Sequence, residues 1–456
     1  MAIGPPTGMR DWLPQDALLR QQLMETISSV YRLYGYLPID TPAMEDLAVL
    51  LGKGGGENEK LLFKILKRGE RFKRMREIGG DVADYGLRFD LTVPLARFVA
   101  THQGKIPKVF RRYHIGPVWR ADRPQKGRFR EFYQCDIDVV GGASSAYEVE
   151  IITATERVLK ELNLGPYRFR LSDKRLLPLV LEGYGVAKNK VGPIMIALDK
   201  LDKDVNQARR EIDDVLAPDT EPWKKVTALL LRAYAVRPHD TGRHERMAEF
   251  KKYWASIDHP TLSTEIENIL ANLQAIIASI QSINPDSNVV FDPILVRGMD
   301  YYTGPIYEAV VEGFPSAVLG GGRYDDLIGQ FAGRKIPAVG CSIGFERILA
   351  ILQERTAGHA VGSVPRALLI CDEGDVGLLQ RQAEQLRNEG LCVETYLDYD
   401  DVGKQFKYAE AAGITWAIKR FDAASSSVTV RYLPERKDLA LPLAEFKARL
   451  GVKKPA

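Results

Sequence analysis

The spacing of apolar residues near the N-terminus predicts one long helix. Over residues 14–35 the apolar positions recur every three or four residues, and Gly35 stands where the run ends. The positions on this face are Leu18, Leu19, Leu23, Ile27, Val30 and Leu33. The next stretch, residues 36–42, is bounded by prolines and predicts a strand.

A second group of segments predicts a strand, a helix and an antiparallel pair of strands. Residues 87–94 alternate as a strand does, and they end at a proline that begins a helix over 94–102. Segment 110–141 predicts two antiparallel strands joined by the loop 121–128. We expect a further helix at about 146–162.

The middle of the chain is helical and then returns to strands. Residues 185–290 show long helical periods with few strand signals, so we interpret them as a helical insertion. Strand patterns return at 289–312 and 316–321, followed by an expected helix around 323–331. A turn then leads to the segment 338–353.

The C-terminal part predicts a separate α/β domain. Small and polar residues at 354–364 predict a linker. The runs ALLICD, CVETYL, WAIKRF and SVTVRYL then alternate with expected helices at about 374–389 and 401–413, which is typical of a parallel or mixed sheet. The expected divisions are therefore 1–184, the insertion 185–290, the continuation 291–353, the linker 354–364 and the domain 365–456.

The composition is that of an ordinary soluble globular protein. The 456 residues are 45% hydrophobic and 27% charged, enough for two or three domains. The apolar stretches are far shorter than a membrane span, and the N-terminal residues lack a secretory pattern, so we expect a cytoplasmic protein. Because the net charge is only +3, a nucleic-acid partner would have to be met by local basic patches.

The cysteines and histidines argue against a structural zinc site. The four cysteines include no CxxC pair, and the six histidines include no HxxxH pair. We expect reduced thiols, with Cys371 and Cys392 as the one pairing to be considered, because they lie on two expected neighbouring strands.

Segment 110–141 carries the most informative polar pattern. Strand periodicity places Arg130, Phe132, Gln134, Asp136 and Asp138 on one face. A cation, an aromatic ring, an amide and two carboxylates are unusual on a core face, because buried polar groups need partners. This face therefore predicts a binding surface for a ligand with both anionic and cationic parts.

A basic run at residues 60–76 has two interpretations. It carries eight lysines or arginines and a single acidic residue, Glu70. The simpler interpretation is a solvated hairpin with charged outer positions, and the other is a contact with a phosphate backbone. The sequence does not decide between them.

Two further segments carry polar residues that suit a small ligand. In LRFDLTVP, Asp90 and Thr92 can hold an ammonium group, although such a pair alone is more often a turn or a helix cap. In LVRGMDYYTG, a cluster of polar and aromatic side chains stands between apolar flanks. Its members are Arg297, Asp300, Tyr301 and Tyr302.

The glycine-rich segments GGGRYDDL (320–327) and AVGCSIGFERI (338–348) do not match the common nucleotide motifs. No GK[ST] follows the first segment, so a Walker phosphate-binding loop is excluded. No GxGxxG lies between a first strand and its helix, so a Rossmann cofactor site is disfavoured. Gly340, Gly344 and Arg347 predict a helix that approaches another backbone closely and presents one arginine. The alternative for Arg347 is an ordinary neighbour of a surface glutamate.

Together these segments resemble the histidyl-tRNA synthetases, a family of class II aminoacyl-tRNA synthetases. Residues 36–46 resemble motif 1, the dimer-forming element, while 110–141 resemble motif 2 and 338–348 resemble motif 3. LVRGMDYYTG and GGGRYD resemble the two histidine-specific signatures that other class II enzymes lack. The resemblance covers essentially the whole chain. It implies an α+β fold, with a class II antiparallel sheet flanked by helices, a helical insertion and a C-terminal α/β anticodon-binding domain.

The resemblance also implies an activity and its partners. Such an enzyme activates L-histidine with ATP and Mg²⁺ to histidyl-adenylate and pyrophosphate, then transfers histidine to the 3′ end of tRNA(His). Members of this type are homodimers. A pocket that satisfies both imidazole nitrogens rejects other amino acids without a separate editing domain.

Roles for individual residues follow from the same resemblance. Arg120 and Arg297 are the implied catalytic residues, which contact the α-phosphate from opposite sides. The implied histidine-binding residues are Asp90, Leu91, Thr92, Arg120, Gln134, Asp138, Arg297, Tyr301, Tyr302 and Tyr324. The implied ATP-binding residues are Arg120, Asp122, Arg128, Phe132 and Arg347. No protein metal site is expected, because Mg²⁺ comes with ATP.

Two segments depart from the pattern of many bacterial members of this family. The DLT and QCDID segments carry aspartate where many bacterial members carry glutamate, so they are closer to the eukaryotic-type pattern.

One alternative function is that of a non-catalytic regulatory subunit of ATP phosphoribosyltransferase, which usually loses part of the active-site set and lacks the C-terminal domain. The other is an ATP-dependent ligase without an RNA partner. Arg120, Arg297 and Arg347 together with residues 365–456 favour the synthetase.

Overall fold

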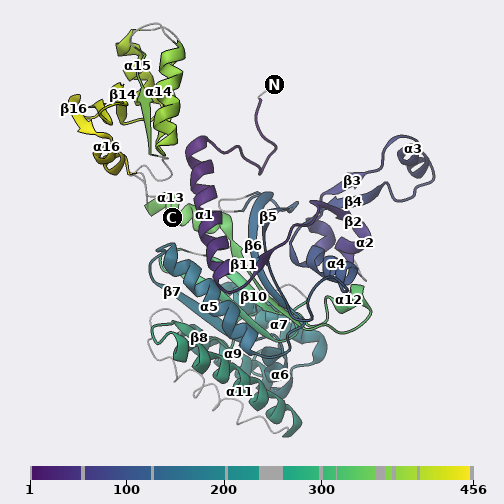
Figure 1. Ribbon diagram of the computed structural model, residues 1–456. Coiled ribbons are helices and arrows are strands. Elements are labelled where there is room, and N and C mark those ends of the chain that lie inside the picture. The colour runs from purple at the N-terminus through teal and green to yellow at the C-terminus, as the bar shows by residue number, and fades with distance from the viewer. Residues whose placement is uncertain are drawn as a thin grey trace. The chain divides into compact units, whose positions relative to one another are not determined.

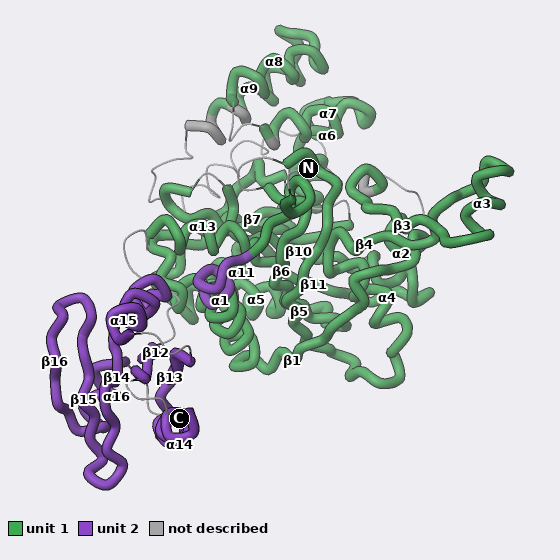
Figure 2. The backbone as a smooth tube through the Cα atoms, turned by 90° about the horizontal axis from the view of Figure 1, so that it is seen from above, with its two compact units in different colours: residues 1–11, 20–357 green, residues 12–19, 358–456 purple. Residues whose placement is uncertain are grey.

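The structure divides the chain into two compact units. It is a computed structural model, and it describes residues 3–52, 57–124, 128–200, 204–235, 260–296, 301–314, 316–355, 365–371, 376–397 and 401–451. Residues 1–11 and 20–357 make up the first unit, and residues 12–19 and 358–456 make up the second (Figure 2).

The first unit is built on an eight-stranded sheet that is largely antiparallel (Figure 1). Only the pairs β1 with β5 and β7 with β8 are parallel. In spatial order the strands are β1 (Leu37–Pro38), β5 (Phe110–Trp119), β6 (Glu131–Val140), β11 (Ala338–Gly344), β10 (Leu319–Arg323), β9 (Pro305–Val311), β7 (Tyr167–Asp173) and β8 (Val289–Phe291). The predicted pair of long strands in segment 110–141 is confirmed, since β5 and β6 pair over ten residues each.

Amphipathic helices cover the sheet. The helix predicted at 14–35 is confirmed as α1 (Pro14–Leu33), and its apolar residues Leu23, Ile27 and Val30 are buried. The helix predicted at 146–162 is confirmed as α5 (Ala146–Glu161), which contacts β6 and β11. Two more helices lie against the sheet: α13 (Phe345–Arg355) contacts β6, and α11 (Pro260–Ile283) contacts β7 and β8.

The strand predicted at 87–94 is wrong. Strand β4 (Ala83–Leu87) ends where that prediction began, and helix α4 (Thr92–His102) starts two residues earlier than expected. The reason is a local hydrogen bond, in which the Val93 N–H donates to Asp90 Oδ1 over 3.0 Å and caps the first turn. Short polar side chains compete with strand pairing in this way.

Other predicted elements are shorter or of another type. The strand expected at 36–42 is reduced to β1, because the prolines at 38 and 42 cannot donate to a strand ladder. The helix expected around 323–331 is only α12 (Gly329–Ala332). Gly340 and Gly344 lie in strand β11 and not in a helix, so only Arg347 stands on the helix that follows.

The stretch interpreted as an insertion contains helices in its described part. These are α7 (Lys188–Asp199), α8 (Val205–Val215), α9 (Glu221–Ala235) and α11, preceded by α6 (Leu176–Gly183). Residues 236–259 lie outside the described residues. Neighbouring helices in this series contact one another, α6 with α7, α7 with α8 and α8 with α9.

A small second sheet lies at the edge of the first unit. Its order is β2 (Met44–Asp46), β4 and β3 (Lys64–Leu66), all antiparallel. Helix α2 (Leu47–Leu51) and a 3-10 turn, η1 (Glu57–Leu61), precede β3. The basic run 60–76 is therefore more than a simple hairpin, because helix α3 (Gly69–Glu77) is inserted between β3 and β4.

The second unit carries a mixed five-stranded sheet, as the sequence predicted. Strands β13 (Cys392–Thr395), β12 (Arg366–Leu369) and β14 (Trp416–Asp422) are parallel, and β15 (Ser427–Tyr432) and β16 (Lys437–Pro442) continue in antiparallel pairing. Helices α14 (Val376–Asn388), α15 (Val402–Ala411) and α16 (Leu443–Leu450) accompany them. All four cysteines lie in described parts of the chain and are free, so Cys371 and Cys392 do not pair. Across the described residues we find no helix with both the length and the apolar character to cross a membrane.

Candidate active site

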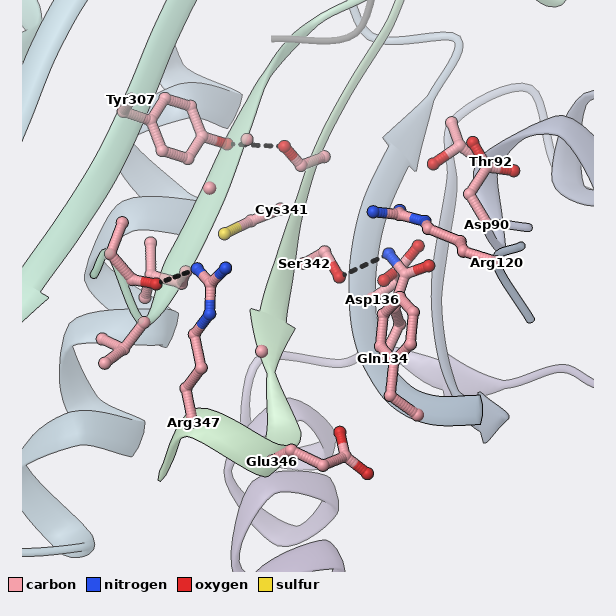
Figure 3. A pocket seen from close by; sticks show the side chains of 18 of the residues that line it. Asp90, Thr92, Arg120, Gln134, Asp136, Tyr307, Cys341, Ser342, Glu346 and Arg347 are labelled. Carbon is pink, nitrogen blue, oxygen red and sulfur yellow. Dashed lines mark hydrogen bonds between the residues drawn. The ribbon is translucent and has the colours of Figure 1, made fainter. Parts of the chain in front are cut away.

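A cavity of about 340 Å³ opens on one face of the large sheet. Its lining comes from segments that are far apart in the sequence: the start of α4, the β5–β6 pair with its loop, residues 301–307, and β10, β11 and the start of α13. The lining residues that carry charge or a hydroxyl are Asp90, Thr92, Arg120, Asp122, Arg128, Asp136, Asp138, Tyr301, Tyr302, Tyr307, Tyr324, Ser342, Glu346 and Arg347. Figure 3 shows ten of the lining residues labelled around this cavity.

Sheet register explains why these residues meet. Asp138 on β6 lies opposite Arg112 on β5 and Gly340 on β11. Two residues along, Asp136 lies opposite His114 and Ser342, and Gln134 lies opposite Gly344. Since directly paired residues share a face, these rows run across three strands on one side of the sheet. The intervening Cys135, Ile137 and Val139 are fully buried on the other side.

The glycines of β11 and β10 make room for the carboxylates. A Cβ atom built on Gly340 would lie 1.9 Å from Asp138 Oδ1, and one on Gly321 would lie 2.3 Å from the Gly340 carbonyl oxygen. No side chain fits at either position. Glycine at these positions therefore allows Asp138 to lie flat against the neighbouring strand.

One end of the cavity is strongly anionic. Asp90, Asp136 and Asp138 all line it and are about 2% exposed. Among the described residues, Asp90 Oδ2, Asp136 Oδ1 and Gln134 Oε1 are buried without a hydrogen-bond donor. Burial raises the pKa of Asp90 to about 6, although the Val93 N–H and the charge of Arg120 act in the opposite direction. Burial likewise raises the pKa of Asp136 and of Asp138.

Arg112 lies beneath these carboxylates and is itself fully buried. Its Nη2 is 2.7 Å from Asp138 Oδ2 and 3.9 Å from Asp136 Oδ2, and it donates to the Leu91 carbonyl over 3.4 Å. The charge of Arg112 lowers the pKa of both aspartates against the effect of burial. Arg112 thus acts on three buried carboxylates in this region, two of which keep an oxygen without a hydrogen-bond donor among the described residues. The pocket is therefore suited to a ligand with donors and positive charge.

Tyrosines enclose the same end of the cavity. The Tyr324 hydroxyl donates to Asp138 Oδ1, and the Tyr301 hydroxyl donates to Thr92 Oγ1 over 3.3 Å. The Tyr301 ring meets both Tyr302 and Tyr324 edge to face, with centroids 5.0 and 5.8 Å apart. Burial raises the pKa of each of these phenols, so they remain protonated donors.

Arginines approach from the other parts of the lining. Arg120, just after β5, donates from Nε to the Phe89 carbonyl over 3.1 Å, and its guanidinium carbon lies 5.0 Å from the Phe132 ring centroid. Arg347 donates from Nη1 to the Ala317 carbonyl. In Figure 3 the two guanidinium groups reach into the cavity from opposite sides, with Cys341 and Ser342 of β11 between them.

Glu346 is a support for this arrangement and not a surface residue. It is 8% exposed, accepts hydrogen bonds from the Tyr133 N–H at 3.0 and 3.1 Å, and pairs with Arg20 at 3.4 Å. The interpretation of Arg347 as the neighbour of a surface glutamate is therefore wrong. These bonds tie the first turn of α13 to β6 and α1, which fixes the position from which Arg347 extends.

The structure brings together most of the residues singled out in the sequence. Asp90, Thr92, Arg120, Asp122, Arg128, Phe132, Gln134, Asp138, Tyr301, Tyr302, Tyr324 and Arg347 all line the cavity. Leu91 does not line the cavity. Its side chain belongs to the buried hydrophobic core, and its carbonyl accepts a hydrogen bond from Arg112. Arg297 and Asp300 lie outside the described residues.

Several lining residues lie outside the set of site residues that the sequence predicts. Asp136 was on the predicted face of β6, so alternation alone was a sufficient signal. No comparable sequence pattern points to Ser342. In the structure its hydroxyl accepts a hydrogen bond from Gln134 Nε2 over 2.9 Å. Tyr307, whose hydroxyl donates to the Gly340 carbonyl over 3.0 Å, had no distinguishing signal in the sequence.

Metal ligands are not clustered in this site. Among the described residues there is no group of three or more His, Cys, Asp or Glu placed to hold a metal ion. Glu346 is engaged by Tyr133 and Arg20, and Asp138 by Arg112 and Tyr324.

Comparisons with known proteins point to one family. The family model for histidyl-tRNA synthetase matches residues 8–348. The histidine–tRNA ligase of Leifsonia xyli is 42% identical over 360 residues, which cover 77% of this chain and 80% of that protein. The histidine–tRNA ligase of Rhodopirellula baltica is 33% identical over 451 residues, covering 95% and 94% of the two chains.

Solved structures share the fold. Histidyl-tRNA synthetase from Nostoc sp. PCC 7120 superposes with a TM-score of 0.81 at 24% identity, over 99% of both chains. A Bacillus halodurans protein described as an ATP phosphoribosyltransferase regulatory subunit/histidyl-tRNA synthetase has a TM-score of 0.69 at 20% identity, over 90% of this chain and 97% of that one.

Proposed function

Because this chain belongs to the histidyl-tRNA synthetase family, we propose that its cavity activates L-histidine with ATP and transfers histidine to the 3′ end of tRNA(His). The observation that carries the proposal is the juxtaposition of unpaired buried carboxylates with two arginines in one cavity. The carboxylates suit the cationic parts of histidine, and the arginines suit its carboxylate and the phosphates of ATP.

The amino acid occupies the anionic end in this proposal. Asp90 and Thr92 bind the α-ammonium group, since Asp90 Oδ2 is buried and lacks a donor among the described residues. Gln134 and Asp138 face the imidazole, and the Tyr302 and Tyr324 hydroxyls close the pocket. An amino acid without ring N–H groups would leave these buried atoms unpaired, which is how the site selects histidine.

The nucleotide occupies the side lined by Arg120, Asp122, Arg128, Phe132 and Arg347. Phe132 stacks on one face of adenine and the Arg347 guanidinium lies against the other. Arg120 contacts both the α-phosphate and the histidine carboxylate. Arg297, which lies outside the described residues, is assigned to the same phosphate from the opposite side.

The reaction then follows from positioning and charge. A carboxylate oxygen of histidine attacks the α-phosphorus of ATP, the bond to the bridging oxygen breaks, and pyrophosphate leaves. Negative charge spreads over the phosphoryl oxygens in the transition state, and fixed guanidinium groups stabilise it without reorganising. In the second step a hydroxyl of the terminal ribose attacks the adenylate carbonyl and AMP leaves. Mg²⁺ bound to the ATP phosphates would neutralise charge and hold the pyrophosphate group in line.

We propose three further properties from the same family membership. Residues 365–456, which belong to the second unit, bind the anticodon part of the tRNA, and residues 185–290 form an insertion within the catalytic domain. The enzyme is a cytoplasmic homodimer, in which exposed Leu37 and Met44 of the motif 1 region are covered by the partner. Light scattering that gives a monomer mass at micromolar concentration would contradict the dimer.

A regulatory subunit without catalysis is the alternative function. The retained Arg120 and Arg347 in one cavity and the presence of the second unit favour the enzyme. Charging of a tRNA(His) transcript with labelled histidine tests the choice. Esterified histidine that is released by mild base supports the synthetase, whereas a folded protein that charges no transcript contradicts it.

A further inference from the structure

One surface element is not explained by the cavity chemistry. Residues 57–87 form what we call the basic hairpin, which consists of η1, β3, α3 and β4. Within it, residues 60–76 contain eight lysines and arginines and one glutamate. Figures 1 and 2 both show α3 at the far end of the β3–β4 pair, away from the large sheet of the first unit.

The basic side chains of this hairpin fall into two groups. Three lysines have nearby carboxylates: Lys64 with Glu59 at 2.7 Å, Lys67 with Asp84 at 3.0 Å and Lys73 with Glu70 at 2.9 Å. Five basic residues are exposed, and their side chains make no hydrogen bond or ion pair with any described residue. These are Lys60, Arg68, Arg71, Arg74 and Arg76. Four of the five members of this group are arginines, the residue type that binds phosphate in a bidentate manner.

Packing does not explain the arginines of helix α3. None of its nine residues is buried, so the helix gains little from packing. Helices of this length are marginal in water, and like charges three residues apart, as in Arg71 and Arg74, weaken them further. Arg74 and Arg76 lie in the last turn, where the helix dipole favours cations, which accounts for part of the charge only. A polyanionic partner would remove the remaining repulsion.

The base of the hairpin is joined to the rim of the cavity. The Leu61 carbonyl accepts a hydrogen bond from the Ala121 N–H over 2.8 Å, immediately after Arg120. Leu62 is buried in a small core with Phe89, the residue whose carbonyl accepts from Arg120 Nε over 3.1 Å. The hairpin therefore rises from the side of the cavity that holds Arg120 and Asp90.

We propose that the basic hairpin binds the phosphate backbone of the acceptor end of the tRNA substrate. The proposal rests on the proposed function, because the reaction requires the terminal ribose to enter the cavity. The phosphates next to that ribose must then pass over the rim, and the arginines of α3 lie on an element anchored there. Such contacts position the RNA without reading its sequence.

The test replaces three arginines of α3 together. The variant Arg71→Gln, Arg74→Gln, Arg76→Gln removes three charges and keeps residues that favour a helix. The matched control, Lys105→Gln, Lys108→Gln, Lys160→Gln, removes the same charge from exposed positions elsewhere on the first unit. Filter binding of a tRNA(His) transcript gives Kd, steady-state charging gives KM for tRNA, and histidine-dependent pyrophosphate exchange reports on the cavity without tRNA.

We expect the α3 variant to raise Kd and KM for tRNA by about tenfold or more, with pyrophosphate exchange unchanged. Its plot of log Kd against log salt should be shallower by about 2 to 3, because each lost phosphate contact removes a little under one unit of slope. Kd and KM within twofold of the wild type would overturn the proposal, as would an equal loss in the control variant. Loss of exchange in the α3 variant would also overturn it, because the hairpin would then act on the cavity. Absence of exchange in the wild type would instead contradict the proposed function, while filter binding would still report on the hairpin.

Discussion

Arg112 lies opposite Asp138 across the β5–β6 pair, with 2.7 Å between Nη2 and Oδ2 and almost no exposure of either side chain. This pair is the structural basis of the anionic pocket. Burial raises the pKa of both Asp136 and Asp138, which favours their protonated forms. The charge of Arg112 acts against that effect and favours the ionised form that can accept from an imidazole.

Replacing Arg112 should therefore damage both stability and histidine recognition. We expect Arg112→Leu to lower the free energy of unfolding by about 3 to 5 kcal/mol, because it leaves buried carboxylates without their cation. If the protein remains folded, KM for histidine should rise at least tenfold more than KM for ATP. Denaturant unfolding and pyrophosphate exchange measure the two effects.

The control for this variant is the neighbouring Arg111→Leu. Arg111 pairs with Glu150 at 2.8 Å, but its side chain is 33% exposed, so we expect a loss of about 1 kcal/mol or less. Equal effects of the two substitutions on KM for histidine would contradict a special role for the buried pair.

Asp90→Asn should stabilise the empty protein while it weakens histidine binding. The pKa of Asp90 is raised from 3.8 to about 6, so the folded state holds its proton to a higher pH than the unfolded state does. The cost of the buried charge is absent below the unfolded pKa, grows as the pH rises between the two values, and is fully present above the folded pKa. The asparagine variant avoids this cost and retains an oxygen to cap Val93. Its gain should be about 1 to 3 kcal/mol at pH 7.5 and close to zero at pH 3.5.

Two measurements check the Asp90 prediction. Chemical denaturation at a series of pH values should give a difference between variant and wild type that rises through the stated window. KM for histidine at pH 7.5 should increase about 10- to 100-fold, because a hydrogen bond to a charged group is lost. A variant with wild-type KM would show that Asp90 does not bind the α-ammonium group.

Gly340→Ala should disrupt Asp138 specifically. The added methyl would lie 1.9 Å from Asp138 Oδ1 and would push this carboxylate away from Tyr324 and Arg112. We expect a loss of about 2 kcal/mol or more in stability and a higher KM for histidine. Gly320→Ala on the adjacent strand is the control for stability, since its Cβ would meet only the Tyr307 carbonyl oxygen at 3.8 Å. A thermal midpoint for Gly340→Ala at or above that of Gly320→Ala would refute the steric argument.

Arg297→Ala should remove a large part of the rate of adenylate formation. Loss of one fixed donor to a developing phosphoryl charge typically lowers kcat by about 100-fold or more. The far-ultraviolet circular dichroism spectrum and the oligomeric mass should stay the same as those of the wild type. Pyrophosphate exchange near the wild-type rate would remove Arg297 from the assigned catalytic pair.

The sequence predicted the elements whose signals are local. The alternation in β6 placed Phe132, Gln134, Asp136 and Asp138 on one face, and that face lines the cavity. Asp90 shows the limit of this approach, because its side chain caps a helix through Val93 and ends the apparent strand. A local hydrogen bond outweighed the alternating pattern there.

Other parts of the site depend on contacts between distant residues. Strand register pairs Gly340 with Asp138, and the packing of α13 brings Glu346 to the Tyr133 N–H. No local sequence pattern encodes either contact. Arg112 looked like one of many arginines in a basic segment, yet it is fully buried. The resemblance of separated segments to one family brought them together, whereas periodicity alone did not.

The central claim is that this cavity activates histidine. ATP–pyrophosphate exchange, measured with each of the twenty amino acids in turn and without tRNA, tests it most directly. We predict exchange with histidine and only background exchange with the others, because the proposed pocket assigns Gln134 and Asp138 to the imidazole ring. No exchange with histidine by a folded sample would contradict the claim and would favour the regulatory-subunit alternative.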